Sequence, residues 1–84
     1  MSERLTVGFT PAEGAVMRVL GVIERRGYVL RALAMSDLDD GASLAIEVEP
    51  RDSGRRVEVL AEQLRRLVDV NQVSLATRDS GSSQ

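Results

Sequence analysis

The stretch LTVGFTPAEGAVMRVLGVI, residues 5–23, decides the fold of this chain. In its first five positions every second side chain is apolar, namely Leu5, Val7 and Phe9. This period-two pattern is typical of a strand with one buried face. A helix signal follows within the same stretch, so we expect a strand that leads through a short connection into a helix.

The helix signal begins at Thr10. Thr10 can cap a helix, Pro11 suits the first helical position, and Glu13 completes a capping box. Apolar residues then recur at helical spacing and form one stripe: Val16, Val19, Leu20 and Ile23. Gly27 suits the left-handed conformation that often ends a helix. The sequence therefore predicts an amphipathic helix between Thr10 and Gly27.

The rest of the chain repeats these two kinds of element. Residues 28–35 are almost wholly apolar and predict a second strand, and residues 44–49 alternate and predict a third. Between them lies a polar turn at 37–41, which ends in an Asp-Gly pair favoured in hairpins. Residues 57–67 predict a second amphipathic helix, and 73–75 predict a short last strand. This βαββαβ order predicts an α+β, ferredoxin-like fold, a four-stranded antiparallel sheet with two helices on one face.

Length and composition fit one small domain. The chain has 84 residues, a mass of 9.1 kDa and a formal net charge of −2. We place the domain at residues 1–76 and expect the polar residues 77–84 to be disordered. No apolar run approaches the ~18 residues that a membrane span needs, and the N-terminus has no signal-peptide pattern. We therefore expect a cytoplasmic protein that does not enter the membrane.

The residue types exclude most catalytic chemistry. The chain has no cysteine, histidine or tryptophan, and its eleven basic residues are all arginine. Disulfides, thiolate metal sites, cysteine nucleophiles, histidine bases and lysine Schiff bases are thereby excluded. Oxygen ligands and carboxylate chemistry remain possible.

The acidic residues do not form a recognisable metal site or catalytic pair. Asp37, Asp39 and Asp40 lack the spacing of a calcium loop, and we interpret them as a solvated hairpin tip. Glu47 and Glu49 share one face of the third strand, where two carboxylates could in principle act as acid and base. Nothing near them in sequence would perturb their ionisation. We predict no metal site, no cofactor and no catalytic residue in this chain.

Arginine pairs at 25–26, 55–56 and 65–66 raise the possibility of nucleic-acid binding. Ferredoxin-like sheets bind RNA through exposed aromatic residues on their central strands. This chain has only Phe9 and Tyr28, and the alternation directs Phe9 into the core. The net negative charge also opposes phosphate binding. We interpret the arginine pairs as solvated helix faces and expect no nucleic-acid partner.

The second strand is apolar on both sides. One side carries Val29, Leu33 and Met35, and the other carries Leu30, Ala32 and Ala34. A strand of a sheet covered on one face should present polar residues on its other face. We expect a second chain to cover this strand; the alternative is an edge strand shielded by loops.

Gly14 falls in the first turn of the predicted helix, where glycine costs ~1 kcal/mol relative to alanine. Glycine there allows a ligand or a partner backbone to approach, and free helical N–H groups suit a carboxylate. The alternative is a glycine that is simply tolerated at a frayed helix end.

Two motifs resemble a known family. The segment GAVMRVLGVI at 14–23, followed by Arg25-Arg26-Gly27-Tyr28, is similar to the opening of the ACT domain in the small regulatory subunit of acetolactate synthase. The segment QLRRLVDV at 63–70, followed by Val73, resembles that family's helix-to-strand signature, L-x-K/R-L-V-D-V-x-x-V. The resemblance covers residues 4–76. Because the chain ends after one domain, it is similar to the short, isozyme II type of subunit.

The resemblance implies a non-catalytic partner subunit. In the family, a large subunit carries thiamine diphosphate, a divalent metal (Mg²⁺) and FAD, and joins two 2-keto acids in branched-chain amino acid biosynthesis. The small subunit raises its activity and often confers feedback inhibition by valine. The resemblance therefore implies the acetolactate synthase large subunit as partner and a branched-chain amino acid as possible effector.

The resemblance also implies a pairing strand and an effector site. ACT domains pair side by side through their second strands, which here carry Tyr28, Val29, Leu30, Leu33 and Met35, and they bind an amino acid at that seam. Effector binding uses the start of the first helix, which matches Gly14 and Ala15. Two asparagines of the family are replaced by Pro11 and Val29. Because their polar groups would hold the charged ends of the amino acid, we expect weak valine binding or none.

Two other functions fit the sequence less well. The first is a free-standing ACT module that senses an amino acid for another enzyme or regulator. The second is a small RNA-binding domain of ferredoxin-like fold.

Overall fold

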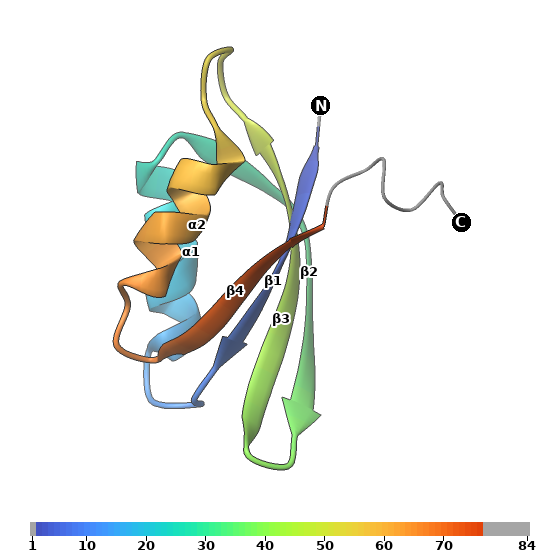
Figure 1. Cartoon of the computed structure of the whole chain (residues 1–84), viewed down its shortest axis with the longest axis vertical. Coiled ribbons are helices and arrows are strands. Elements are labelled where there is room, and N and C mark those ends of the chain that lie inside the picture. The colour runs from blue at the N-terminus through green and yellow to red at the C-terminus, as the bar shows by residue number, and fades with distance from the viewer. Residues whose placement is uncertain (1, 77–84) are drawn as a thin grey trace, which may run out of the picture.

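A computed structural model of the chain describes residues 2–76. Residues 77–84, predicted to be disordered, lie outside the described residues. The elements follow in the order β1 (Glu3–Phe9), α1 (Ala15–Arg25), β2 (Tyr28–Leu38), β3 (Gly41–Pro50), α2 (Val57–Arg65) and β4 (Val70–Ala76). All neighbouring strands are antiparallel, in the sheet order β2-β3-β1-β4. Both helices lie on one face of the sheet (Figure 1), as the sequence predicts.

The core lies between that face and the two helices. Along β1, every second side chain is buried, beginning with Leu5, and β3 alternates in the same way. The helices contribute their apolar stripes to the same cluster, α1 through Val19 and Ile23 and α2 through Leu60 and Leu64. Helix α1 packs on β2, and α2 packs on β4. Within residues 2–76 no helix has the length and apolar character needed to cross a membrane.

The predicted capping box at the start of α1 is wrong. The helix begins at Ala15, and Gly14 is its N-cap residue with a φ of +79°. Thr10 follows β1 directly and bonds to the start of β4 instead. Its N–H donates to the carbonyl of Asp69 at 2.8 Å, and its hydroxyl accepts from Asn71 at 3.5 Å. Because that hydroxyl bonds across to β4, it does not cap α1. The prediction for Gly27 is confirmed by its φ of +85°.

Strand β2 contains a bulge that changes which of its residues share a face. Leu30 pairs with Val48, whereas Ala32 pairs with the next residue of β3, Glu47, so Arg31 is an extra residue. Directly opposed residues share a face, and Val48 is buried under the helices. From the bulge onward the alternation is therefore inverted.

The inverted alternation corrects the predicted sides of β2. Leu33 opposes Ile46 and Met35 opposes Leu44, so both lie on the helix side together with Leu30. Val29, Ala32 and Ala34 lie on the side that the helices do not cover. The strand also continues to Leu38, and the hairpin turn consists of Asp39 and Asp40.

Candidate functional site

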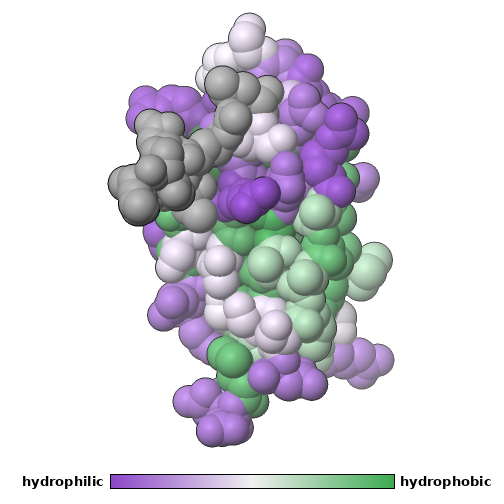
Figure 2. All heavy atoms as spheres, turned by 90° about the vertical axis from the view of Figure 1, so that its right-hand side faces the viewer, coloured by the Kyte–Doolittle hydropathy of each residue, from purple (hydrophilic) through white to green (hydrophobic). Residues whose placement is uncertain are grey.

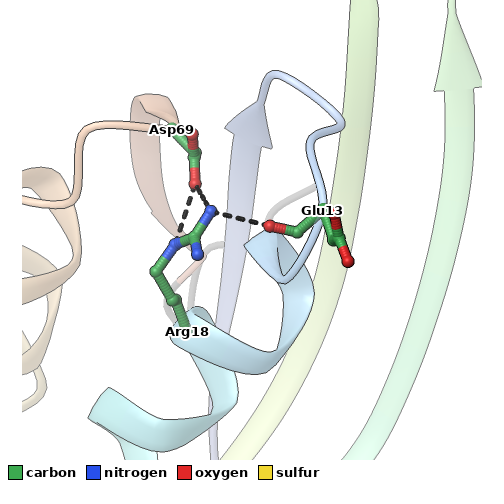
Figure 3. A network of polar contacts seen from close by, with 3 residues as sticks. All are labelled: Glu13, Arg18 and Asp69. Atoms are coloured by element: carbon green, nitrogen blue, oxygen red, sulfur yellow. Dashed lines mark hydrogen bonds and ion pairs between the residues drawn. The ribbon is translucent and has the colours of Figure 1, made fainter.

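The loop before α1 is fixed to the start of β4 by Arg18. The Arg18 Nε donates to Oδ2 of Asp69 at 3.0 Å, and its Nη2 contacts the same oxygen. Nη2 also donates to the carbonyl oxygen of Glu13 at 3.1 Å. Figure 3 shows the guanidinium between these two segments. One charged side chain thus joins the loop, the helix and the last strand at the sheet end where the sequence predicts an effector.

Gly14 has a backbone reason for being glycine. Its φ of +79° lies in the left-handed region, where a side chain is disfavoured. A Cβ at this position would also lie 3.0 Å from Nη1 of Arg18. No side chain caps α1, so the first turn offers N–H groups without a side-chain acceptor. The same geometry that requires glycine therefore leaves an exposed helix start.

One chain brings together only part of the predicted effector site. Pro11 and Gly14 are exposed in the loop before α1, and Ala15 is buried at the first helical position. This loop follows Phe9, which pairs with Ala42 of β3, and Ala42 in turn pairs with Asp37 of β2.

Val29 lies at the opposite end of the sheet. It pairs with Glu49, near the end of β3, whereas Asp37 marks the end that carries the loop. Asp37 is eight positions after Val29, a separation of roughly 25 Å along the strand. Any site that uses both Gly14 and Val29 needs Val29 from a second copy of the chain.

The uncovered face of the sheet and its β2 edge carry exposed apolar side chains. Along the β2 edge, residues 31–38 are all exposed, among them Leu38 at 54% and the two helix-side residues Leu33 at 42% and Met35 at 51%. Figure 2 shows apolar surface gathered in the middle of this face, beside hydrophilic residues. A shallow hollow of about 290 Å³ lies here, between Ala32 and Ala34 of β2, Ala45 of β3 and Thr6 of β1. An edge strand of this length and composition is a surface that can accept another strand.

The carboxylates on this face are paired with arginines. Glu47 approaches Nε of Arg4 at 3.9 Å, and Glu49 approaches Nε of Arg31 at 2.8 Å. This arrangement fits the interpretation of both as surface charges. Among residues 2–76, no group of acidic side chains is placed to hold a metal ion.

Both aromatic residues are buried, Phe9 at 1% exposure and Tyr28 at 2%. Neither can stack with a base on the open sheet face, which removes the usual basis for RNA recognition by this fold. The arginines of the three predicted solvated pairs are all exposed, and two of them also connect elements. Arg26 donates to Gln63 between the helices at 2.8 Å, and Arg65 donates to the carbonyl of Val73 in β4 at 3.0 Å.

A comparison with models of known protein families agrees with this fold. Residues 11–73 match the model of the ACT domain family, and the chain belongs to that family. It is 31% identical over 74 residues to the acetolactate synthase isozyme 3 small subunit of Escherichia coli K12, an alignment that covers 88% of this chain. The acetolactate synthase small subunit of Buchnera aphidicola is 26% identical over 73 residues. The chain spans about half the length of these curated relatives, 45% and 46%.

Solved structures show the same architecture. An ACT domain protein from Streptococcus pneumoniae superposes with a TM-score of 0.77 at 17% identity, covering 100% of this chain and 97% of its own. The ACT domain of a GTP pyrophosphokinase from Chlorobium tepidum superposes with a TM-score of 0.74 at 14% identity, covering 90% and 97%. At these identities the likeness establishes the fold. The predicted α+β ACT fold is confirmed.

Proposed function

We propose that this chain is a non-catalytic regulatory subunit of acetolactate synthase, which activates the large subunit by binding it. The observation that carries this proposal is the alignment with acetolactate synthase small subunits over 74 residues, nearly the whole described chain. Thiamine diphosphate, Mg²⁺ and FAD would all belong to the large subunit. Activation requires that the chain bind the active conformation of that subunit more tightly than the inactive one.

The chain would pair with a second copy through β2, by extending the sheet across a two-fold axis. Leu33 is the midpoint of the eleven-residue strand, so antiparallel pairing about it would bring the Val29 end of one copy's strand to the Asp37 end of the other's. Asp37 lies at the sheet end that carries Gly14. Pairing about Leu33 would therefore bring together the two halves of the predicted effector site that a single chain keeps apart.

The effector site so formed would hold valine weakly or not at all. Pro11 has no N–H and no polar side chain, and Val29 offers only methyl groups. N–H groups in the first turn of α1, which no side chain caps, could still receive a carboxylate. An ammonium group would meet neither of the side-chain amides that the family uses. Burying that charge without partners is costly, so activation without strong feedback is the expected behaviour.

The decisive experiment adds the purified chain to a matching large subunit and measures acetolactate formation. We expect stimulation and co-elution of the two proteins in size-exclusion chromatography. The ACT domain protein from Streptococcus pneumoniae has the same fold at 17% identity, so it serves as a control for fold alone. Absence of both stimulation and co-elution would reject the proposal in favour of a free-standing ACT module.

Valine binding is measured separately, by calorimetric titration into the chain alone and into the complex. We expect little heat in either case. Tight stoichiometric binding to the chain alone would contradict the weak-effector prediction. It would leave the activating role to be decided by the assay above.

A further inference from the structure

A second hollow lies at the other end of the helical layer from Gly14. Its volume is about 260 Å³, and it opens between the end of α1 and the start of α2. Three arginines line it, Arg26 after α1 and Arg55 and Arg56 before α2. Its remaining lining comes from Tyr28, Gly54, Val59 and Leu60, so no acidic side chain is among the residues that line it.

The Tyr28 hydroxyl is a buried group without a partner at this hollow. Only 2% of the surface of Tyr28 is exposed, and its hydroxyl makes no hydrogen bond. Buried hydroxyls are nearly always hydrogen-bonded, so an unpartnered one needs an explanation. Burial raises the pKa of Tyr28 most, Arg55 lowers it, and Glu3 and Glu58 raise it. The hydroxyl is thus a spare donor beside an arginine at the start of a helix.

Gly27 leaves room for the Arg55 guanidinium beside this hollow. The guanidinium lies over Gly27, where a Cβ would come within 2.4 Å of Cζ and Nε. Only the absence of a side chain at Gly27 allows this approach. Gly27 also accepts from the N–H of Arg51 at 2.9 Å, which fixes the loop before α2 against the end of α1. The loop, the glycine and the arginine therefore form one local arrangement around Tyr28.

The start of α2 adds backbone donors. The helix has nine residues, and its N-cap residue, Arg56, makes no side-chain capping bond. Its first N–H groups carry the positive end of the helix dipole. The arginines do have partners: Arg55 meets Asp52 at 3.0 Å, Arg56 meets Glu58 at 3.7 Å, and Arg26 meets Gln63 at 2.8 Å. These contacts are on the surface and are weak, so an anion can compete for the guanidinium groups.

We propose that this hollow binds the phosphate group of a small molecule. Arg55 and Arg56 would hold phosphate oxygens by paired N–H bonds, the first turn of α2 would add backbone donors, and the Tyr28 hydroxyl would donate the bond it now lacks. Val59 and Leu60 provide an apolar wall for whatever the phosphate is attached to. The site is separate from the effector end and does not depend on the acetolactate synthase partner.

The test titrates inorganic phosphate into the full chain, against chloride at matched ionic strength. Tyr28 is the single tyrosine and tryptophan is absent, so tyrosine fluorescence reports on this site directly. We expect a saturable change with phosphate and none with chloride. Parallel titrations with glycerol phosphate and with ADP distinguish free phosphate from a phosphate carried on an organic group. Absence of saturation with all three would overturn the proposal.

Variants locate the binding. We expect Arg55→Gln and Arg56→Gln each to weaken phosphate binding roughly tenfold, because each removes a charge-assisted donor. Arg66→Gln is the matched control, an exposed arginine just after the same helix, and should change affinity by less than about twofold because it does not line the hollow. Equal weakening by all three would show only general attraction to positive charge and would reject the site.

Tyr28→Phe keeps the buried ring and removes only the hydroxyl. Its phosphate binding is followed by NMR chemical shifts of the α2 backbone N–H groups, since the variant has no tyrosine fluorescence. We expect weaker binding with an unchanged fold. A variant that folds and binds phosphate as tightly as the parent would remove the hydroxyl from the site and overturn the assignment.

Discussion

Gly14 and Gly21 show how differently two glycines of one helix are constrained. Gly14, before α1, has a positive φ and lies close to Arg18. Gly21 is inside α1, and the nearest atom to a Cβ there is Nη1 of Arg25 at 3.7 Å, an ordinary contact distance. The first glycine is required by the backbone, whereas the second is a helix position that alanine would fill better.

The same substitution should therefore have opposite effects at these two positions. Gly14→Ala should lower the free energy of unfolding by about 1 kcal/mol or more, because a left-handed conformation disfavours a side chain. Gly21→Ala should raise it by about 0.5–1 kcal/mol through helix propensity. Urea unfolding followed by circular dichroism measures both. Equal effects of the same sign would contradict the assigned conformations.

Tyr28 makes stability depend on pH in the alkaline range. Burial raises the pKa of Tyr28, Glu3 and Glu58 raise it further, and Arg55 opposes them. An unfolded tyrosine ionises near pH 10, while the folded one keeps its proton to higher pH. Above about pH 10 the folded state binds more protons than the unfolded state, so stability falls as pH rises. Below about pH 10 the contribution of Tyr28 to stability is fully present.

The pH dependence of unfolding above about pH 10 can be assigned to Tyr28 because few other groups titrate in that range. The chain has no lysine, and arginine stays charged to beyond about pH 12. We expect the urea midpoint to decline above about pH 10 in the parent and to decline less in Tyr28→Phe. Identical declines in both proteins would assign the effect to other groups.

Residue-scale interpretation from the sequence was right for Gly27 and wrong for the capping box. Gly27 follows an amphipathic stripe, and the local pattern alone determines its conformation. The role of Thr10 depends on Asp69 and Asn71, which are distant in sequence. The sequence places Tyr28 on the pairing strand but does not predict the hollow that Tyr28 and Arg55 line, because that hollow depends on how the loop before α2 lies against Gly27.

At the scale of elements, β2 is the least typical part of the molecule. The apolar content of this strand predicts that another chain covers it. In the single chain, its eleven residues form an edge of the sheet on which Leu33 and Met35 are exposed. The bulge at Arg31 could not be predicted, because a bulge is defined by register against β3 rather than by composition. The other elements follow their own hydrophobic periodicity, although α1 begins later than predicted, at Ala15, and β4 begins earlier, at Val70.

A charge at the midpoint of β2 should prevent pairing between two copies. In Leu33→Glu, pairing about the two-fold axis brings two carboxylates together, so we expect the dimer to dissociate. Val59→Glu introduces the same charge at a similarly exposed apolar residue of α2, 51% exposed, and should leave the dimer intact. Analytical ultracentrifugation measures both. A monomeric parent, or a Leu33→Glu protein that remains dimeric, would contradict pairing through β2.

At the scale of the whole molecule, both helices and all four strands share one hydrophobic cluster. A domain of this size with one core should unfold in a single transition. Tyr28 fluorescence and far-ultraviolet circular dichroism should therefore give the same urea midpoint. Two separate midpoints would show that the end around Tyr28 unfolds independently.

Pairing of two copies adds a concentration dependence. Mass action predicts a midpoint that rises with protein concentration in the parent and stays constant in Leu33→Glu. Unfolding the parent over a hundredfold range of concentration measures this. If the parent is a dimer by ultracentrifugation but its midpoint does not depend on concentration, dimerisation is not coupled to folding.

The bulge at Arg31 also limits how far assembly can go. An exposed apolar edge strand is a template onto which unrelated extended chains can add without end. Here the edge is interrupted at Arg31, whose charge is held by Glu49, so an uninterrupted run of edge backbone begins only at Ala32. An edge that pairs with its own copy across a two-fold axis is consumed on both partners at once. We therefore expect the chain to form closed pairs in solution rather than fibrils.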